Sequence, residues 1–202
     1  MNGRVRLAVL FVLVAACTAP AIVPATSTPD AVRTDAVGNV RGPVADEATW
    51  ARLSAHPVAP PPVAAGTPCP KSSAAQVSPF TGPVAGPGPV FVSGNTLFYT
   101  RSDDGTLSAK VAWISRPEYT GPALVRGRRV DVPGDVRFGV GNGAPTTELR
   151  FDYDTHVRAA GSEEGWRFLP SSVIVPSAGC YAFQIDGLDW SVTVVMEAVP
   201  NP

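Results

Sequence analysis

Polar and apolar side chains alternate along several stretches of the second half of the chain. In the clearest case, Glu148 to Val157, every second residue is polar: Glu148, Arg150, Asp152, Asp154 and His156. Side chains in a β-strand point alternately to opposite faces, so this pattern predicts a half-buried strand with one solvated face. Two further alternating runs, 181–185 and 190–196, flank an Asp186-Gly187 turn and predict a β-hairpin.

Shorter apolar runs at 89–92, 97–100, 107–115, 123–132 and 172–175 are separated by turn-forming residues such as Ser93-Gly94-Asn95 and Gly141-Asn142-Gly143. Many short strands without a convincing amphipathic helix predict an all-β fold, an immunoglobulin-like β-sandwich over residues 67–200. A closed barrel is the alternative.

The first 16 residues differ from the rest of the chain. Arg4 and Arg6 precede an uncharged run from Leu7 to Ala16. Ten residues in a helix span about 15 Å, half of the roughly 30 Å of a bilayer core, so the pattern indicates a signal peptide over 1–16.

The peptide ends in Val14-Ala15-Ala16-Cys17, which resembles the lipobox of bacterial lipoproteins. The resemblance implies cleavage before Cys17 and acylation of Cys17, so that the lipid membrane is a partner and the protein sits on the extracytoplasmic face of the cell membrane. Ordinary secretion and a retained anchor are the alternatives.

Residues 17–66 carry few large apolar side chains. Of the 22 prolines, 14 lie between Pro20 and Pro89. Such a composition cannot bury enough surface to offset the entropy of ordering, which predicts a disordered, Pro-rich spacer. One stretch, 45–55, has a possible cap at Asp46 and the apolar residues Trp50 and Leu53. It is either a marginal helix that frays or a helix that docks on a partner or on the domain.

Charge argues against a nucleic-acid partner. The chain has 16 basic and 17 acidic residues, and removal of Arg4 and Arg6 with the signal peptide leaves 14 against 17, a net charge of −3. A mildly acidic surface is unsuited to a phosphate backbone.

With Cys17 assigned to lipid, Cys69 and Cys180 remain. In an oxidising compartment two remaining cysteines most simply form a disulfide. A metal pair or two free thiols are the alternatives, although a zinc site needs more ligands than this pair and two scattered histidines offer.

Four landmarks of the domain form a pattern: Cys69-Pro70, Lys110–Trp113, Gly127-Arg128-Arg129 and Pro176–Tyr181. They resemble uncharacterised secreted and lipid-anchored bacterial domains in which a Gly-Cys-aromatic motif opens a late strand. In that family the late cysteine pairs with an early Cys-Pro. The resemblance therefore implies the same disulfide and a similar fold, and it implies no activity.

Asp152, Asp154 and His156 are the strongest candidates for metal binding or hydrolysis, because they share one strand face. Carboxylates that lie roughly 6.6 to 7 Å apart along a strand need help from loops to share a cation. The simpler interpretation is a solvated face whose charges pair with Arg150 and Arg158. No Gly-x-Ser-x-Gly motif is present. We expect no enzyme, no cofactor and no metal, with an envelope hydrolase or metal-dependent enzyme on this face as the alternative.

Binding candidates are a basic cluster, Arg126, Arg128 and Arg129, and two aromatic residues near loops, Tyr119 and Trp166. The arginines could meet an envelope protein or an anionic polysaccharide, or they could simply discourage strand pairing at a sheet edge. The aromatic rings could stack on a ligand or pack over the end of the sandwich. The sequence thus predicts a membrane-anchored lipoprotein whose sandwich is a binding or structural module of the cell envelope.

Overall fold

A computed structural model describes residues 33–34, 40–41, 44–64, 66–152 and 165–202. Within this part of the chain the protein is all-β apart from one short helix, as the alternating pattern predicts. The elements are β1 (Arg33–Thr34), β2 (Val40–Arg41), α1 (Glu47–Ser54), β3 (Ala74–Gln76), β4 (Pro83–Ala85), β5 (Val90–Ser93), β6 (Thr96–Arg101), β7 (Leu107–Ser115), β8 (Ala123–Arg129), β9 (Arg137–Gly139), β10 (Glu148–Phe151), β11 (Arg167–Val175), β12 (Gly179–Asp186) and β13 (Ser191–Pro200).

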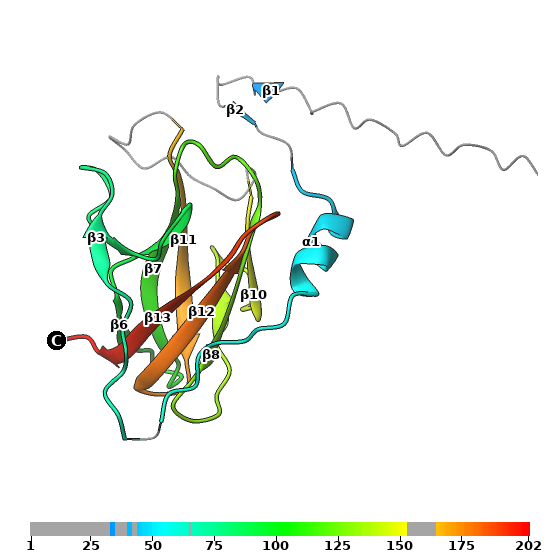
Figure 1. Ribbon diagram of the computed structural model, residues 1–202. Helices are drawn as coiled ribbons and strands as arrows, with labels where there is room; N and C mark the ends of the chain where they lie inside the picture. The colour runs from blue at the N-terminus through cyan, green and yellow to red at the C-terminus, as the bar shows by residue number, and fades with distance from the viewer. Residues whose placement is uncertain (1–32, 35–39, 42–43, 65, 153–164) are drawn as a thin grey trace, which may run out of the picture.

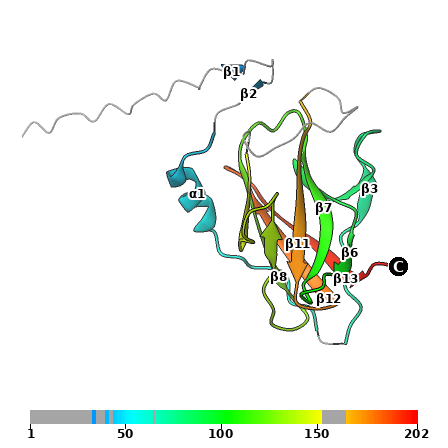
Figure 2. The same cartoon turned by 180° about the vertical axis from the view of Figure 1, so that it is seen from behind.

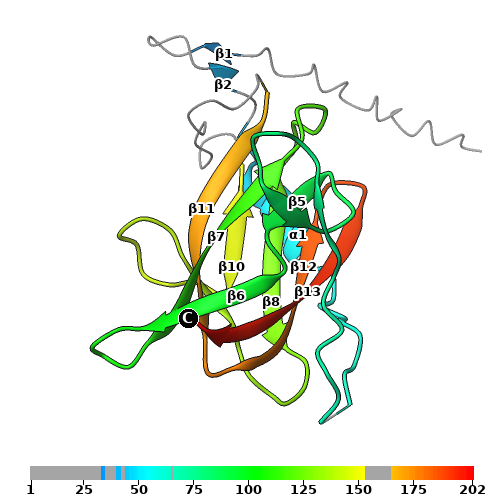
Figure 3. The same ribbon diagram turned by 90° about the vertical axis from the view of Figure 1, so that its left-hand side faces the viewer.

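The strands form a sandwich-like fold of two layers (Figure 1). One layer has the order β10-β8-β12-β13, and the other contains β9, β11, β7, β5, β4 and β3. Strand β6 joins the two layers, because it pairs in parallel with β13 and antiparallel with β7 (Figure 3). The described strands thus form the expected all-β, sandwich-like fold.

The main core lies between the layers and is built from the inward-facing residues of the long strands. Trp113 of β7 is fully buried and makes edge contacts with Phe138 and Phe183, at ring-centroid distances of 6.1 and 5.8 Å. Its indole Nε1 donates a hydrogen bond to Ser171 Oγ at 3.0 Å, which satisfies the polar atom that burial removes from water. Each such aromatic side chain contributes about 1.5–3 kcal/mol through burial.

The predicted hairpin is β12 and β13, with Asp186 opposite Ser191. The turn is closed by a hydrogen bond from Gly187 N to Trp190 O at 2.8 Å. A Cβ at residue 187 would lie 2.2 Å from the Trp190 ring, so glycine is required there. Strand β10, in contrast, ends at Phe151 and is shorter than the expected Glu148–Val157 stretch, whose last residues lie outside the described part of the chain.

Cys69 and Cys180 are joined, with an S–S distance of 2.00 Å and a separation of 111 positions along the chain. Cys180 is the second residue of β12, a strand flanked by β8 and β13. The bond therefore fixes the start of the sandwich to a central strand, as the cysteine count and the resemblance both imply.

The stretch 45–55 contains a helix, and the helix docks on its own domain. Asp46 caps α1 by accepting a hydrogen bond from Thr49 N at 2.8 Å. Trp50 and Leu53 are buried against Leu124 of β8, on the outer face of that layer (Figure 2). Residues 44–64 of the expected spacer thus lie against the sandwich. Among the described residues, no helix is long and apolar enough to cross a membrane.

Candidate functional site

Residues 44–64, which we call the strap, run over the outer face of the β10-β8-β12 layer (Figures 1 and 2). Outward-facing polar side chains of these three strands contact α1 and the segment that follows it. Further along, Val63 packs beside the Cys69–Cys180 disulfide and Val130. Two connected sites result, a polar face that holds the strap and a groove beside its proline-rich end.

Arg126 of β8 holds the C-terminal end of α1. Its Nη1 donates to Ser54 O at 2.9 Å, and its Nη2 donates to Leu53 O at 3.3 Å. The last carbonyls of a helix lack partners within the helix and carry partial negative charge, so a guanidinium satisfies them well. Arg126 is only 8 % exposed. The expected basic binding cluster therefore does not include Arg126, because this side chain is covered by the strap.

The charge of Arg126 is balanced by Asp186 of β12, whose Oδ2 lies 2.6 Å from Arg126 Nη2. Asp186 is fully buried and also accepts hydrogen bonds from Ser191 Oγ and Gln184 Nε2. Burial by itself would raise the pKa of Asp186. The hydrogen bonds from Ser191, Arg126 and Gln184 outweigh it and hold the pKa below its ordinary value.

The N-terminal part of the strap is held by β10 and the residue after it. Asp152 Oδ2 accepts a hydrogen bond from Ala45 N at 2.7 Å. Arg150 pairs with Glu47 at 2.6 Å and lies 5.1 Å from the Trp50 ring centre. The hydrogen bonds from Arg150 lower the pKa of Glu47.

Two further hydrogen bonds hold the strap. Ser54 Oγ donates to Glu148 at 3.1 Å, and Ala59 N donates to Gln184 Oε1 at 3.1 Å. Like Ala45, Ala59 is thus held through a bond from its backbone amide to a side chain of the sheet.

Asp152 was expected on a solvated strand face with Asp154 and His156. It is instead buried, 3 % exposed, and bonded to the strap. Asp154 and His156 lie outside the described residues, so the arrangement expected for a metal site or a hydrolase is not visible. Among the described residues, no group of three or more histidine, cysteine or acidic side chains could hold a metal ion.

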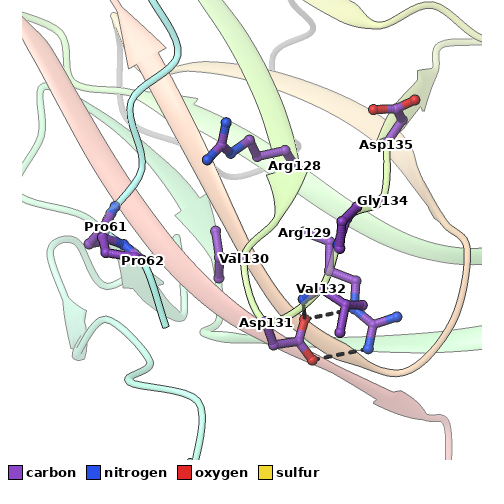
Figure 4. A pocket seen from close by; sticks show the side chains of 10 residues that line it. Pro61, Pro62, Arg128, Arg129, Val130, Asp131, Val132, Gly134 and Asp135 are labelled. Atoms are coloured by element: carbon purple, nitrogen blue, oxygen red, sulfur yellow. Dashed lines mark hydrogen bonds and ion pairs between the residues drawn. The ribbon is translucent and has the colours of Figure 1, made fainter. Parts of the chain in front are cut away.

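A groove of about 470 Å³ lies between Pro61 and Pro62 of the strap and the 128–135 segment at the end of β8 (Figure 4). Val130 and Val132 add apolar surface to it. Arg128 is exposed in this groove and has no ion-pair partner among the described residues.

The other charges of the groove do not neutralise Arg128. Asp131 pairs with Arg129, at 2.7 Å to its Nε and 3.0 Å to its Nη2, and this contact lowers the pKa of Asp131. Arg129 is turned away from Arg128 and lies over the Tyr181 ring. Asp135 also points away from Arg128 (Figure 4). The groove therefore presents one unneutralised cation between apolar walls.

The rings of Tyr119 and Trp166 pack against other side chains of the domain and do not form an aromatic binding surface. Tyr119 makes an edge contact with Trp190 at 5.1 Å, and its hydroxyl donates to Pro122 O. Burial raises the pKa of Tyr119 to about 12. Trp166 is 7 % exposed and belongs to a small apolar cluster with Phe91. Neither ring lines the groove, so the structure agrees with the packing alternative for both.

Comparison with models of known protein families gives no match, and comparison with curated proteins gives none either. The candidate site therefore rests on its own geometry. Sequence reasoning found Arg128 and missed its neighbours Pro61 and Pro62, whose Pro60-Pro61-Pro62 run indicated only an extended chain. It also missed Gln184, and it assigned Asp186 only to a turn.

Proposed function

We propose that this protein is a lipid-anchored, extracytoplasmic binding module of the cell envelope, attached through Cys17. The lipobox-like Val14-Ala15-Ala16-Cys17 supports the anchor. The Cys69–Cys180 pair supports an oxidising compartment, because disulfides persist there and are rare in the cytosol.

The single observation that carries the binding role is the unneutralised Arg128 in a groove with proline and valine walls. A guanidinium recognises carboxylates through paired hydrogen bonds, and apolar walls favour the aliphatic parts of an extended ligand. Sugars are usually bound on aromatic faces, and none of the described residues that line this groove is aromatic. The ligand that fits best is therefore an acidic, extended peptide segment of an envelope protein rather than a polysaccharide.

Binding of fluorescein-labelled oligoglutamate, measured by fluorescence anisotropy, tests this role. Arg128→Gln should weaken binding by about 10-fold or more, because one charge-assisted pair contributes roughly 1.5–3 kcal/mol. Arg137→Gln removes an exposed charge from β9, outside the groove, and is the matched control. Equal losses in the two variants, or binding of an anionic polysaccharide and not of oligoglutamate, would contradict the proposed ligand.

Membrane fractionation tests the anchor separately. Cys17→Ser should move the protein from the membrane fraction to the soluble extracytoplasmic fraction. Unchanged partitioning of this variant would contradict lipidation and leave the groove argument intact.

A further inference from the structure

The contact between strap and sandwich combines a few apolar side chains with many polar groups. Within α1 only Trp50 and Leu53 are buried. Ala45 and Val63 add apolar contacts near the two ends of the strap, and the remaining attachments are polar contacts to β8, β10, β12 and Asp152. Contacts within a chain that are this polar resemble transient interfaces, which open without unfolding the parts they join.

The two ends of the strap are attached differently. Shortly after its C-terminal end, the chain is bonded covalently to β12 through Cys69. At its N-terminal end Ala45 is held by a hydrogen bond to Asp152. A strap that opens from this end is therefore stopped at the disulfide, and the sandwich stays closed.

The strap also supplies one wall of the groove, since Pro61 and Pro62 belong to it. The opposite wall carries Arg128, two residues after Arg126 on β8, and alternate residues of a strand share a face. On this face Arg126 thus holds the strap, and Arg128 lines the groove. The groove exists as described only while the strap is docked.

We infer that the strap detaches as one unit from an intact sandwich and that detachment removes the proline wall of the groove. A ligand in the groove then stabilises the docked strap. By linkage, detachment of the strap lowers the affinity of the groove for the ligand by the same factor. A pull on the N-terminal end of the strap would have this effect. The identity of the ligand rests on the proposed function, whereas detachment of the strap does not.

Amide hydrogen exchange of the full mature chain, followed by NMR, tests the detachment. The amides of Ala45 and Ala59 bond only to side chains of the sheet, so their exchange reports docking directly. Both should exchange with the same opening free energy and at least about 100-fold faster than Phe183 in β12. Different opening free energies for the two amides, or exchange as slow as that of Phe183, would overturn the inference.

A variant of the strap gives an independent measurement. Trp50→Ala should speed exchange at Ala45 and Ala59 by about 100-fold, as loss of a buried tryptophan predicts, and leave Phe183 unchanged. Arg52→Lys, at an exposed position of α1, is the matched control and should leave exchange at Ala45, Ala59 and Phe183 unchanged. Acceleration at Phe183 in the Trp50→Ala variant would show that strap and sandwich open together, against the inference.

Oligoglutamate tests the link to the groove. At 100 times its dissociation constant it should slow exchange of both strap amides by about 100-fold. Oligoglutamate that binds through Arg128 without slowing them would overturn the link. If oligoglutamate does not bind, the proposed ligand is wrong, and the exchange order of strap and sandwich still decides whether the strap detaches.

Discussion

Replacement of Arg126 by methionine is the sharpest perturbation of the face that holds the strap. Methionine keeps most of the aliphatic length and removes the charge, which leaves Asp186 buried with its hydrogen bonds from Ser191 and Gln184 and with His56 Nδ1 at 3.5 Å. Removal of one partner of a buried ion pair costs about 3–5 kcal/mol. Arg126 Nε is itself buried without a hydrogen-bond partner among the described residues, so its removal returns part of that cost. We expect a net loss of about 3 kcal/mol.

Urea unfolding followed by circular dichroism measures this loss. Arg150→Met is the matched control, because Arg150 also contacts α1 but its ion pair with Glu47 is open to solvent, with side chains 42 and 81 % exposed. An exposed pair contributes up to about 1 kcal/mol, and the cation–π contact of Arg150 with Trp50 adds about 0.5–1 kcal/mol. The Arg126 variant should therefore lose more stability than the control, by a factor of about two.

A double-mutant cycle isolates the pair itself. Asp186→Asn removes the buried negative charge and keeps the shape of the side chain. The variant carrying both Arg126→Met and Asp186→Asn should lose less stability than the two single losses added together, because no unpaired charge remains. Additive losses, or an Arg126→Met loss no larger than that of the control, would refute the reasoning.

Three further predictions concern cross-linking and pH. Substitution of both Cys69 and Cys180 by alanine should cost about 4–5 kcal/mol, since the bond closes a loop of 111 residues, and equal unfolding midpoints with and without reductant would contradict this. The pKa values of Glu47 and Asp186 are lowered in the folded chain, so their contribution is present above the unfolded pKa and is lost as the pH falls below about 4. Exchange of the strap amides should accelerate there, and equal opening free energies at neutral and acidic pH would refute the assignment. Because the pKa of Tyr119 is raised to about 12, its contribution to stability is present below pH 10 and lost as the pH rises through about 12. An ultraviolet titration should show this late ionisation, and Tyr119→Phe should reduce its amplitude by one tyrosine and leave that of Tyr181, whose pKa burial also raises.

Local patterns in the sequence predicted local structure well. Alternation located the hairpin, the count of cysteines located the disulfide, and a cap with two apolar residues located α1. Each of these features depends on neighbouring residues or on simple pairing. The sequence could not decide whether α1 docks, because docking depends on residues of β8 and β12 that are more than 70 positions away, as for Arg126 Nη1 and Ser54 O.

The arginine cluster shows why the site was predicted only in part. Arg126, Arg128 and Arg129 are adjacent in sequence, and proximity suggested one basic surface. In the structure Arg126 is covered by the strap, Arg128 lines the groove and Arg129 turns away to pair with Asp131. Strand alternation separates Arg128 from Arg129. Arg126 and Arg128 share a strand face and differ because the strap covers Arg126 and leaves Arg128 in the groove. No local pattern in the sequence predicts where the strap runs.

The sequence of β12 contains one indication that another segment covers its outer face. Its inward residues, Tyr181, Phe183 and Ile185, are large and apolar, as a core requires. Its outward residues begin with two small ones, Cys180 and Ala182, where a charged side chain would suit an open face. Small residues are needed there because the chain around Val63 and Cys69 crosses directly above them.

The outward residues of β12 then change to Gln184 and Asp186, which bond a backbone amide of the strap and the guanidinium that holds α1. The outer face of β12 thus matches the strap along its length. Its small residues, Cys180 and Ala182, leave room for the chain near Val63, and its polar residue Gln184 bonds Ala59. Substitution of Ala182 by lysine should displace the part of the strap near Val63 and so disturb the groove next to Pro61. Substitution of Gln184 by alanine removes the acceptor of Ala59 N and should raise exchange at Ala45 as well as at Ala59, because the strap opens as one unit. Acceleration at Ala59 alone would contradict opening as a unit.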